Sequence, residues 1–138
     1  MLRITDAARR NIVADCQARR PEEACGFLIS DVSGRVVRAV VADNVWPDAA
    51  ERAHRFAIEP LTQLKVERDC DAAGQAVAGY YHSHPTAPAF PSEFDHSRAW
   101  PVYHYVIVGF SHGDSVEFRS WRLDEFDRFV EHAVEIVE

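Results

Sequence analysis

Two apolar segments joined by a tight turn limit the folds open to this chain more strongly than any other feature. Residues 102–110 read VYHYVIVGF and residues 115–123 read SVEFRSWRL, and both are rich in β-branched and aromatic residues. Gly113 and Asp114 stand between them and favour a two-residue turn. The sequence therefore predicts a β-hairpin in the second half of the chain.

The remaining segments alternate between strand and helix patterns without strict order. A helix begins after Thr5 and ends before Pro21, and a second helix begins at Pro60 and fades over residues 71–74. Strands are predicted at residues 25–30, 35–41, 55–58 and 75–82, and a polar loop at residues 44–52. This imperfect alternation favours an α+β fold with one mixed sheet and two or three helices.

The last segment fits two kinds of structure. Residues 126, 129, 130, 133, 134 and 137 are apolar at helical spacing, whereas residues 130, 134 and 136 share one face of a strand. Residue periodicity leaves both interpretations of 125–138 open.

Length, composition and charge exclude several classes of function. The 138 residues predict a single domain over 1–138, and no apolar run approaches the roughly 20 residues needed to cross a bilayer. The first ten residues lack the apolar region of a secretion signal, so we expect a cytoplasmic protein. The net charge of −7 disfavours a nucleic-acid surface. Cys16, Cys25 and Cys70 lie too far apart for a metal knuckle and are expected to be buried thiols.

The stretch YHSHPTAPAFPSEFD at residues 81–95 carries the pattern of a metal site. If the preceding strand continues, His82 and His84 project from the same face, and neutral imidazole is a preferred zinc ligand. Pro85 ends the strand, and a proline-stiffened loop leads to a short helix in which Asp95 can be a third ligand. Three protein ligands leave a fourth position open for water, which is the catalytic pattern.

Hydrolysis needs two further groups. Ser92 lies three residues before Asp95, so its hydroxyl could sit beside the metal, although S-x-x-D is also an ordinary helix-capping pattern. A general base must come from elsewhere, and the candidates are Glu22 and Glu23 at the start of a buried strand. Desolvation there would raise the pKa of a carboxyl group toward the useful range.

Each part of this pattern also has an unremarkable explanation. An isolated H-x-H is more often a surface or core pair, and paired glutamates after a proline usually lie on a solvated helix end. The other histidines have no partner at short ligand spacing; they are His54, His96, His104, His112 and His132. Phe56 and Trp100 could line a groove beside the site.

The joint spacing H-x-H-x7-S-x-x-D, preceded by Glu23-Ala24-Cys25-Gly26 about 60 residues upstream, resembles the signature of the JAMM (MPN-plus, JAB1/MPN/Mov34) metallopeptidases. The resemblance extends from about Pro21 to Leu123 and is closest to the compact prokaryotic branch. It implies the MPN fold, a curved mixed sheet with helices packed on it. In that fold the last segment returns as an edge strand.

The resemblance also implies a role for each residue. His82, His84 and Asp95 would be the zinc ligands. Glu23 would be the general acid/base, and Ser92 would stabilise the oxyanion. The implied activity is that of a zinc-dependent peptidase or isopeptidase acting at the glycine-ended tail of a ubiquitin-like or sulfur-carrier protein, with no nucleic-acid or membrane partner.

Two other functions are compatible with the same residues. The chain could be a metal-stabilised module that binds ubiquitin-like tails without cutting them, although an intact Glu23 argues against that. It could also be a zinc amidohydrolase of small amides, which a groove blocked at one end would favour.

Overall fold

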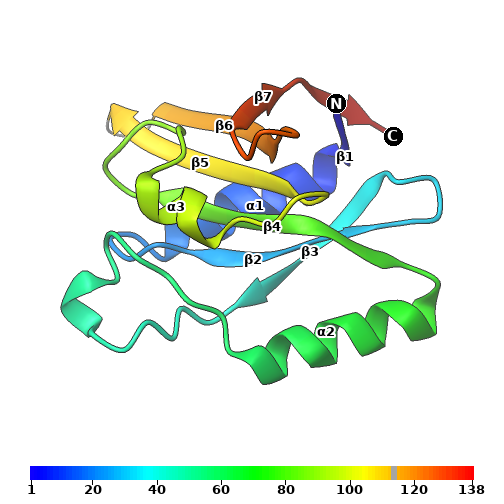
Figure 1. Cartoon of the computed structure of the whole chain (residues 1–138), viewed down its shortest axis with the longest axis horizontal. Helices are drawn as coiled ribbons and strands as arrows, with labels where there is room; N and C mark the ends of the chain where they lie inside the picture. The colour runs from blue at the N-terminus through cyan, green and yellow to red at the C-terminus, as the bar shows by residue number, and fades with distance from the viewer. Residues whose placement is uncertain (113–114) are drawn as a thin grey trace.

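A computed structural model describes residues 1–112 and 115–138, and they form a mixed sheet flanked by helices (Figure 1). The sheet has the strand order β7-β6-β5-β4-β2-β3-β1-β8. Neighbours pair in parallel at β4–β5, β1–β3 and β1–β8, and antiparallel elsewhere. The α+β fold class predicted from the sequence is confirmed.

The elements follow one another along the chain as β1 (Leu2–Thr5), α1 (Asp6–Ala18), β2 (Cys25–Ser30), β3 (Val36–Ala42), the 3-10 turn η1 (Ala49–Glu51), α2 (Pro60–Ala73), β4 (Ala76–His84), α3 (Glu93–Arg98), β5 (His104–His112), β6 (Ser115–Leu123), β7 (Phe129–His132) and β8 (Val134–Val137). β5 and β6 pair antiparallel as the predicted hairpin, while its turn at Gly113 and Asp114 lies outside the described residues.

The two long helices cover opposite faces of the sheet, because β2 is buried on both sides. Leu28 packs with Ala8 and Ile12 of α1, whereas Phe27 packs with Val66 of α2. Successive residues of a strand point to opposite faces, so the continuous apolar run CGFLIS serves both cores. Thr5 caps α1 as predicted, through a hydrogen bond of 3.2 Å from the Ala8 amide.

The strand predicted at residues 55–58 is wrong. The segment belongs to no strand, and its peptide groups bond to residues of the preceding loop. The Arg55 carbonyl accepts from the Asn44 side chain, and the Ala57 amide donates to the same side chain. The Ala57 carbonyl accepts from the Val45 amide at 2.9 Å. The segment is therefore part of the connection between β3 and α2, and residues 56–58, which line a groove described below, are called the 56–58 wall.

The ambiguous last segment forms two short strands. β7 pairs with β6 at one edge of the sheet, and β8 pairs with β1 at the other. Ala133 alone separates them, and its carbonyl accepts from the Leu2 amide at 2.8 Å. One short run of chain therefore spans the distance between the two edges, which requires the sheet to curve strongly, and it leaves the two chain ends close together (Figure 1). The edge strand implied by the resemblance is confirmed.

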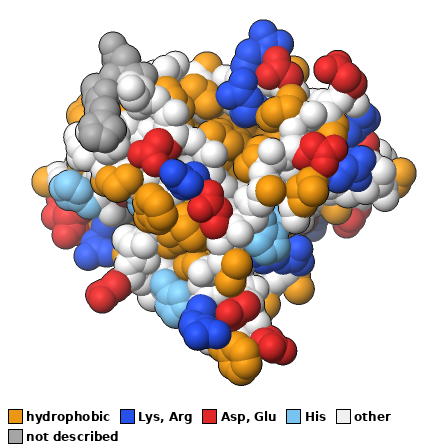
Figure 2. All heavy atoms as spheres, turned by 90° about the horizontal axis from the view of Figure 1, so that it is seen from above, with side chains coloured by type: hydrophobic (Ala, Val, Ile, Leu, Met, Phe, Trp, Pro, Cys, Tyr) orange, Lys and Arg blue, Asp and Glu red, His pale blue; other side chains and the backbone are white. Residues whose placement is uncertain are grey.

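The surface carries charges of both signs. On the face shown in Figure 2, acidic and basic side chains are interspersed among hydrophobic ones. Among the residues that the structure describes, none of the helices has the length and apolar character that crossing a bilayer requires.

Candidate metal centre

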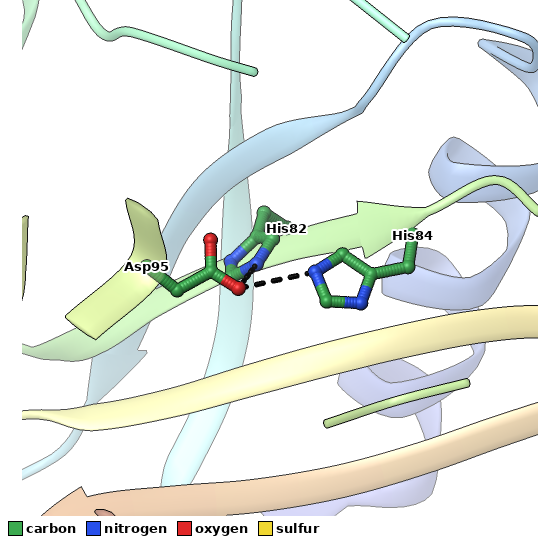
Figure 3. Close-up of side chains that lie close together, drawn as sticks. All are labelled: His82, His84 and Asp95. Carbon is green, nitrogen blue, oxygen red and sulfur yellow. Dashed lines mark hydrogen bonds and ion pairs between the residues drawn. The ribbon is translucent and has the colours of Figure 1, made fainter. Parts of the chain in front are cut away.

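β4 presents His82 and His84 on one face, as the alternation of strand residues predicts (Figure 3). Ser83 points to the opposite face, where its hydroxyl accepts from the Ala24 amide at 2.8 Å. The Ser83 amide in turn donates to the Ala24 carbonyl at 3.1 Å. This reciprocal pair holds the residue after Glu23 against the strand that carries both histidines.

α3 presents Asp95 to the two imidazoles. The Ser92 hydroxyl accepts from the Asp95 amide at 3.0 Å, and the Ser92 amide donates to Asp95 Oδ2 at 2.9 Å. This is a complete capping box, and it fixes the direction of the Asp95 side chain. The helix-cap interpretation and the ligand interpretation of S-x-x-D are therefore both compatible with one geometry.

The three side chains converge on one point (Figure 3). Asp95 Oδ2 lies 3.1 Å from Nε2 of His82 and 3.1 Å from Nε2 of His84, and all three ligand atoms lie within 4.8 Å of one another. Bonds of about 2.0–2.1 Å to a tetrahedral zinc ion would place ligand atoms about 3.3 Å apart. All three residues are buried, and within ranges 1–112 and 115–138 they form the group that could hold a metal ion.

The hydrogen bonds around His84 prepare one nitrogen for a metal. Its Nδ1 lies 2.9 Å from the Pro88 carbonyl, which can only accept, so Nδ1 carries the proton and Nε2 faces Asp95. Burial lowers the pKa of His84, but the hydrogen bonds to Asp95 and to the Pro88 carbonyl outweigh burial and raise it. A proton on Nε2 thus occupies the place that a metal ion would take.

The charge of Asp95 is strongly favoured in this setting. Burial pushes its pKa up, but the neighbouring His82 and His84 imidazoles and the Ser92 amide dominate and hold the pKa far below its ordinary value. A permanent carboxylate beside two imidazoles is a donor set suited to zinc.

Glu23 lies at the entrance to β2 and is buried, whereas its neighbour Glu22 is exposed. Its Oε1 has no hydrogen-bond partner among the described residues. Burial raises the pKa of Glu23 to about 8, with Asp95 adding to the increase and with His84 and Arg55 opposing it. A buried carboxyl group that has no hydrogen-bond partner at Oε1 and interacts electrostatically with His84 and Asp95 is suited to proton transfer.

The loop between the histidines and α3 lies close on β5. A Cβ atom at Gly109 would lie 2.6 Å from the Ala89 amide nitrogen and 2.8 Å from the Ala87 carbonyl oxygen. The Phe110 amide donates to that same Ala87 carbonyl at 3.2 Å. Glycine at this position lets the proline-rich loop pack against the sheet, which sets where α3 begins.

Aromatic rings support the buried ligands from the loop side. Phe56 stacks on the His82 imidazole with ring centroids 4.8 Å apart and an interplanar angle of 24°. Phe94 of α3 contacts Phe56 edge-on, and the Arg55 guanidinium lies 4.7 Å above the Phe94 ring. These packing contacts restrict the orientation of the His82 ring from the loop side.

A groove begins at His82 and Asp95, two of the three converging side chains that we call the ligand group because they could hold a metal ion. It has a volume of about 210 Å³ and is lined mainly by aromatic and aliphatic side chains from the 56–58 wall, α2, β4, β5, β7 and the α3 region: Phe56, Ala57, Ile58, Gln63, Tyr80, His82, Asp95, Arg98, Trp100, Tyr105, Ile107 and Phe129. A second hollow shares Gln63, Tyr80 and Trp100 with it and continues to Tyr103. The groove therefore leads from the ligands toward the surface beside Trp100.

Sequence reasoning found part of this groove. The structure places Phe56 and Trp100 in its lining, as predicted. Tyr80 was missed, although it stands two residues before His82 on the same strand face and alternation alone indicates it. Asn44, which organises the loop beside the groove, was missed because three of its hydrogen-bond partners lie 11 to 21 residues away in the sequence: Glu23, Arg55 and Ala57.

The other histidines lie apart from the group where the structure describes them. His96 is exposed and bonds through Nε2 to the Asp127 carbonyl. His104 packs at the start of β5, where burial lowers its pKa to about 4. Its ring contacts that of His132 at 6.4 Å between centroids. The side chain of His112 lies outside the described residues.

The sequence of this chain is similar to those of a known family and of several known proteins. Residues 5–124 match the sequence model of a family described as prokaryotic homologs of the JAB domain. A desampylase of Haloferax volcanii is 36% identical over 107 residues, which are 77% of this chain and 74% of that protein. A probable TtuB-protein conjugate cleaving protease of Thermus thermophilus is 35% identical over 92 residues, which are 64% of this chain and 57% of that protein.

Solved structures share the fold. A protein from Desulfitobacterium hafniense superposes with a TM-score of 0.84 at 25% identity, covering 100% of this chain and 94% of that one. A JAB1/MPN domain protein from Archaeoglobus fulgidus superposes with a TM-score of 0.62 at 18% identity, covering 99% of this chain and 97% of that one. The curved sheet with its helices is the JAB/MPN fold.

Proposed function

The chain belongs to the family of prokaryotic homologues of the JAB domain, and on that premise we propose that it is a zinc-dependent hydrolase of conjugates formed by ubiquitin-like or sulfur-carrier proteins. The bond it cuts lies at the glycine-ended tail of the carrier and is a peptide or isopeptide bond. The observation that carries the proposal is the convergence of two imidazoles and a carboxylate beside the buried carboxyl group of Glu23.

His82, His84 and Asp95 would hold the zinc ion. The fit rests on their shared contact at Asp95 Oδ2, which lies 3.1 Å from Nε2 of each histidine, and on the burial of all three side chains. A zinc ion held there would supply Lewis acidity for the scissile carbonyl and would lower the pKa of bound water.

Glu23 would transfer the proton. Because burial raises its pKa to about 8, this carboxyl group can both accept a proton from the attacking water and return it to the leaving amine near neutral pH. The reciprocal Ala24–Ser83 hydrogen bonds keep Glu23 aligned with the histidine strand.

Ser92 would stabilise the developing oxyanion. Its hydroxyl oxygen already accepts a hydrogen bond from the Asp95 amide, so the hydroxyl proton remains available for donation to a substrate oxygen. The same side chain thus sets the direction of Asp95 and presents a donor at the first turn of α3.

The groove accounts for the class of substrate. Its aromatic lining leads away from the ligands past Tyr80 to the exposed Trp100, so an extended tail can lie along it with its end at the metal. Glycines at that end would pass between the large side chains without steric conflict. Because the groove continues to a second hollow, it favours a tail over a small amide.

The proposal is tested with Glu23→Gln and a matched control. The purified parent should carry about one zinc ion per chain. Glu23→Gln should keep zinc and fold but lose at least about a hundredfold in the cleavage of a carrier fused to a reporter through its terminal glycine. Glu22→Gln alters the exposed neighbouring carboxylate and should cut like the parent.

Two results would contradict it. Metal analysis that finds no zinc under chelator-free conditions would remove the metal site from the proposal. A Glu23→Gln variant that cuts as fast as the parent would show that Glu23 is misassigned. Assaying a linear fusion beside a lysine-linked conjugate separates peptide from isopeptide activity.

Two further expectations remain predictions of the sequence. We propose that the catalytic domain comprises residues 1–138 and that the protein acts in the cytoplasm, where carrier conjugates would be its substrates.

A further inference from the structure

Asn44 lies just after β3 and uses all of its hydrogen-bonding capacity in one place. Its Nδ2 donates to the carbonyls of Glu23 at 3.1 Å and Arg55 at 3.0 Å. Its Oδ1 accepts from the amides of Trp46 at 3.1 Å and Ala57 at 3.3 Å. A carboxamide is the side chain that offers two donors and an acceptor with two lone pairs in one plane.

These bonds fix the main chain of Glu23. Its carbonyl is held by Asn44, and its amide donates to the Arg52 carbonyl at 2.7 Å. Both peptide groups therefore bond to the 44–58 loop, which the Asn44 side chain itself organises. The carboxyl group of Glu23 extends from this clamped backbone into the site, where its Oε1 has no partner among the described residues.

The same bonds fix the residue that packs on a ligand. The Arg55 carbonyl and the Ala57 amide, both bonded to Asn44, flank Phe56 on its two sides. Phe56 stacks on His82 with ring centroids 4.8 Å apart. One side chain thus connects the segment that carries Glu23 to the ring that orients His82.

We infer that Asn44 is a positioning residue for the hydrolytic site, because its carboxamide sets the placement of Glu23 and of the Phe56–His82 stack relative to each other. The inference rests on the proposed function, since it assigns Asn44 to the support of the proposed base. Asn44 touches neither the ligand atoms nor the groove, so it acts through Glu23 and Phe56.

The test compares Asn44→Ala with Asn11→Ala. Asn11 is the other asparagine of the chain and is exposed on α1, so it is a matched control. Asn44→Ala should keep about one zinc ion per chain and lower kcat about tenfold to a hundredfold, with KM for a linear carrier fusion changed less than about twofold. Asn11→Ala should match the parent in kcat, KM and zinc content.

A second readout does not depend on activity. Because Phe56 stacks on His82, its ring current should shift the ring-proton resonances of His82 in zinc-free protein, and Asn44→Ala should move them toward their positions in Phe56→Leu. Asn44→Asp keeps the acceptor for Trp46 and Ala57 but not the donors to Glu23 and Arg55, so it tests the donor half if the alanine variant unfolds.

The outcomes separate this inference from the proposed function. Unchanged kcat and unchanged His82 resonances in both Asn44 variants would overturn the inference, and so would a loss of activity explained wholly by lost zinc. A parent that binds no zinc and cuts no conjugate would instead overturn the proposed function, while the His82 resonances would still decide the role of Asn44.

Discussion

Glu23 shows how burial alone prepares one side chain for a task. It differs from Glu22 only in position along the chain, yet it is buried while Glu22 is exposed. Desolvation disfavours the charged form, so the pKa of Glu23 rises to about 8. The same desolvation has a consequence for stability that can be measured without substrate.

In zinc-free protein, the free energy of unfolding should fall with pH because of Glu23. Its pKa is about 8 in the folded chain against a reference value of 4.5. The folded state binds this proton more tightly, so the contribution is fully present below pH 4.5 and is lost as pH rises toward 8. The Glu23→Gln variant has no titrating carboxyl group at this position, so its free energy of unfolding should not show this decrease with pH.

The difference in unfolding free energy between Glu23→Gln and the parent should therefore grow by about 1.4 kcal/mol per pH unit within that window. Denaturant titrations in chelator at several pH values measure it. Glu22→Gln is the control and should follow the parent. Parallel curves for Glu23→Gln and the parent would show that Glu23 titrates alike in both states.

At the scale of elements, β4 serves two environments at once. Tyr81 and Ser83 face α1, where the Tyr81 hydroxyl donates to Asp15 at 2.7 Å, while Tyr80 and His82 face the groove. Any displacement of this strand therefore affects a core and the ligand group together. Its close parallel pairing with β5 begins at Gly79, opposite His104.

Gly79→Ala should destabilise the fold. The added Cβ would lie 1.9 Å from the His104 carbonyl oxygen and 2.7 Å from its carbonyl carbon, so backbone would have to move. We expect a loss of about 2–3 kcal/mol in unfolding free energy, measured by denaturant titration.

Gly74→Ala is the matched control at the end of α2. Gly74 has φ of 68° and open space around it, so the same substitution there should cost only about 1 kcal/mol. Equal effects at the two glycines would contradict the close approach of β4 and β5.

At the scale of the whole molecule, the ligand group joins separate parts of the fold. His82 and His84 come from the central strand β4, and Asp95 comes from α3 after a loop that crosses β5. A metal ion binding there would connect them, and ligands that bind only the folded state raise the free energy of unfolding.

Zinc should therefore stabilise the entire chain. At a free zinc concentration one hundred times the dissociation constant, the free energy of unfolding should rise by about 2.7 kcal/mol over that of chelated protein. Thermal unfolding with buffered zinc measures this. His84→Gln should fold but lose most of the increase, whereas substitution of His54, an exposed histidine of the loop, should leave it intact. An equal increase in both variants would place zinc elsewhere.

Much of the site could be predicted because its signals are local. Strand alternation over three residues puts His82 and His84 on one face, and a capping pattern over four residues directs Asp95. The apolar strand that follows indicates that a carboxyl group of Glu22 or Glu23 could be desolvated, without deciding which of the two is buried. Such signals depend on covalent geometry and on hydrogen bonds between near neighbours, so the sequence displays them directly.

Other parts of the structure depend on hydrogen-bonding partners that are far away in the sequence, and the periodicity of a segment does not reveal such partners. Residues 55–58 have strand composition, yet the Asn44 side chain, 11 residues before Arg55, bonds to the Arg55 carbonyl and the Ala57 amide in place of a neighbouring strand. By its own periodicity, the last segment fits either a helix or a strand. It forms two strands because β6 and β1 each have an otherwise unpaired edge to which part of the segment can bond.

The sequence by itself indicated most of the elements, the α+β class and the three residues proposed as metal ligands, because each depends on side-chain type and short spacing; it assigned residues 55–58 wrongly and left residues 125–138 open. Only the tertiary structure decided that Glu23 is buried beside those ligands, that Asn44 ties it to Phe56, and that a groove leads away from the site. These depend on which surfaces meet when the curved sheet forms, since burial and hydrogen-bond partners are properties of the packed chain.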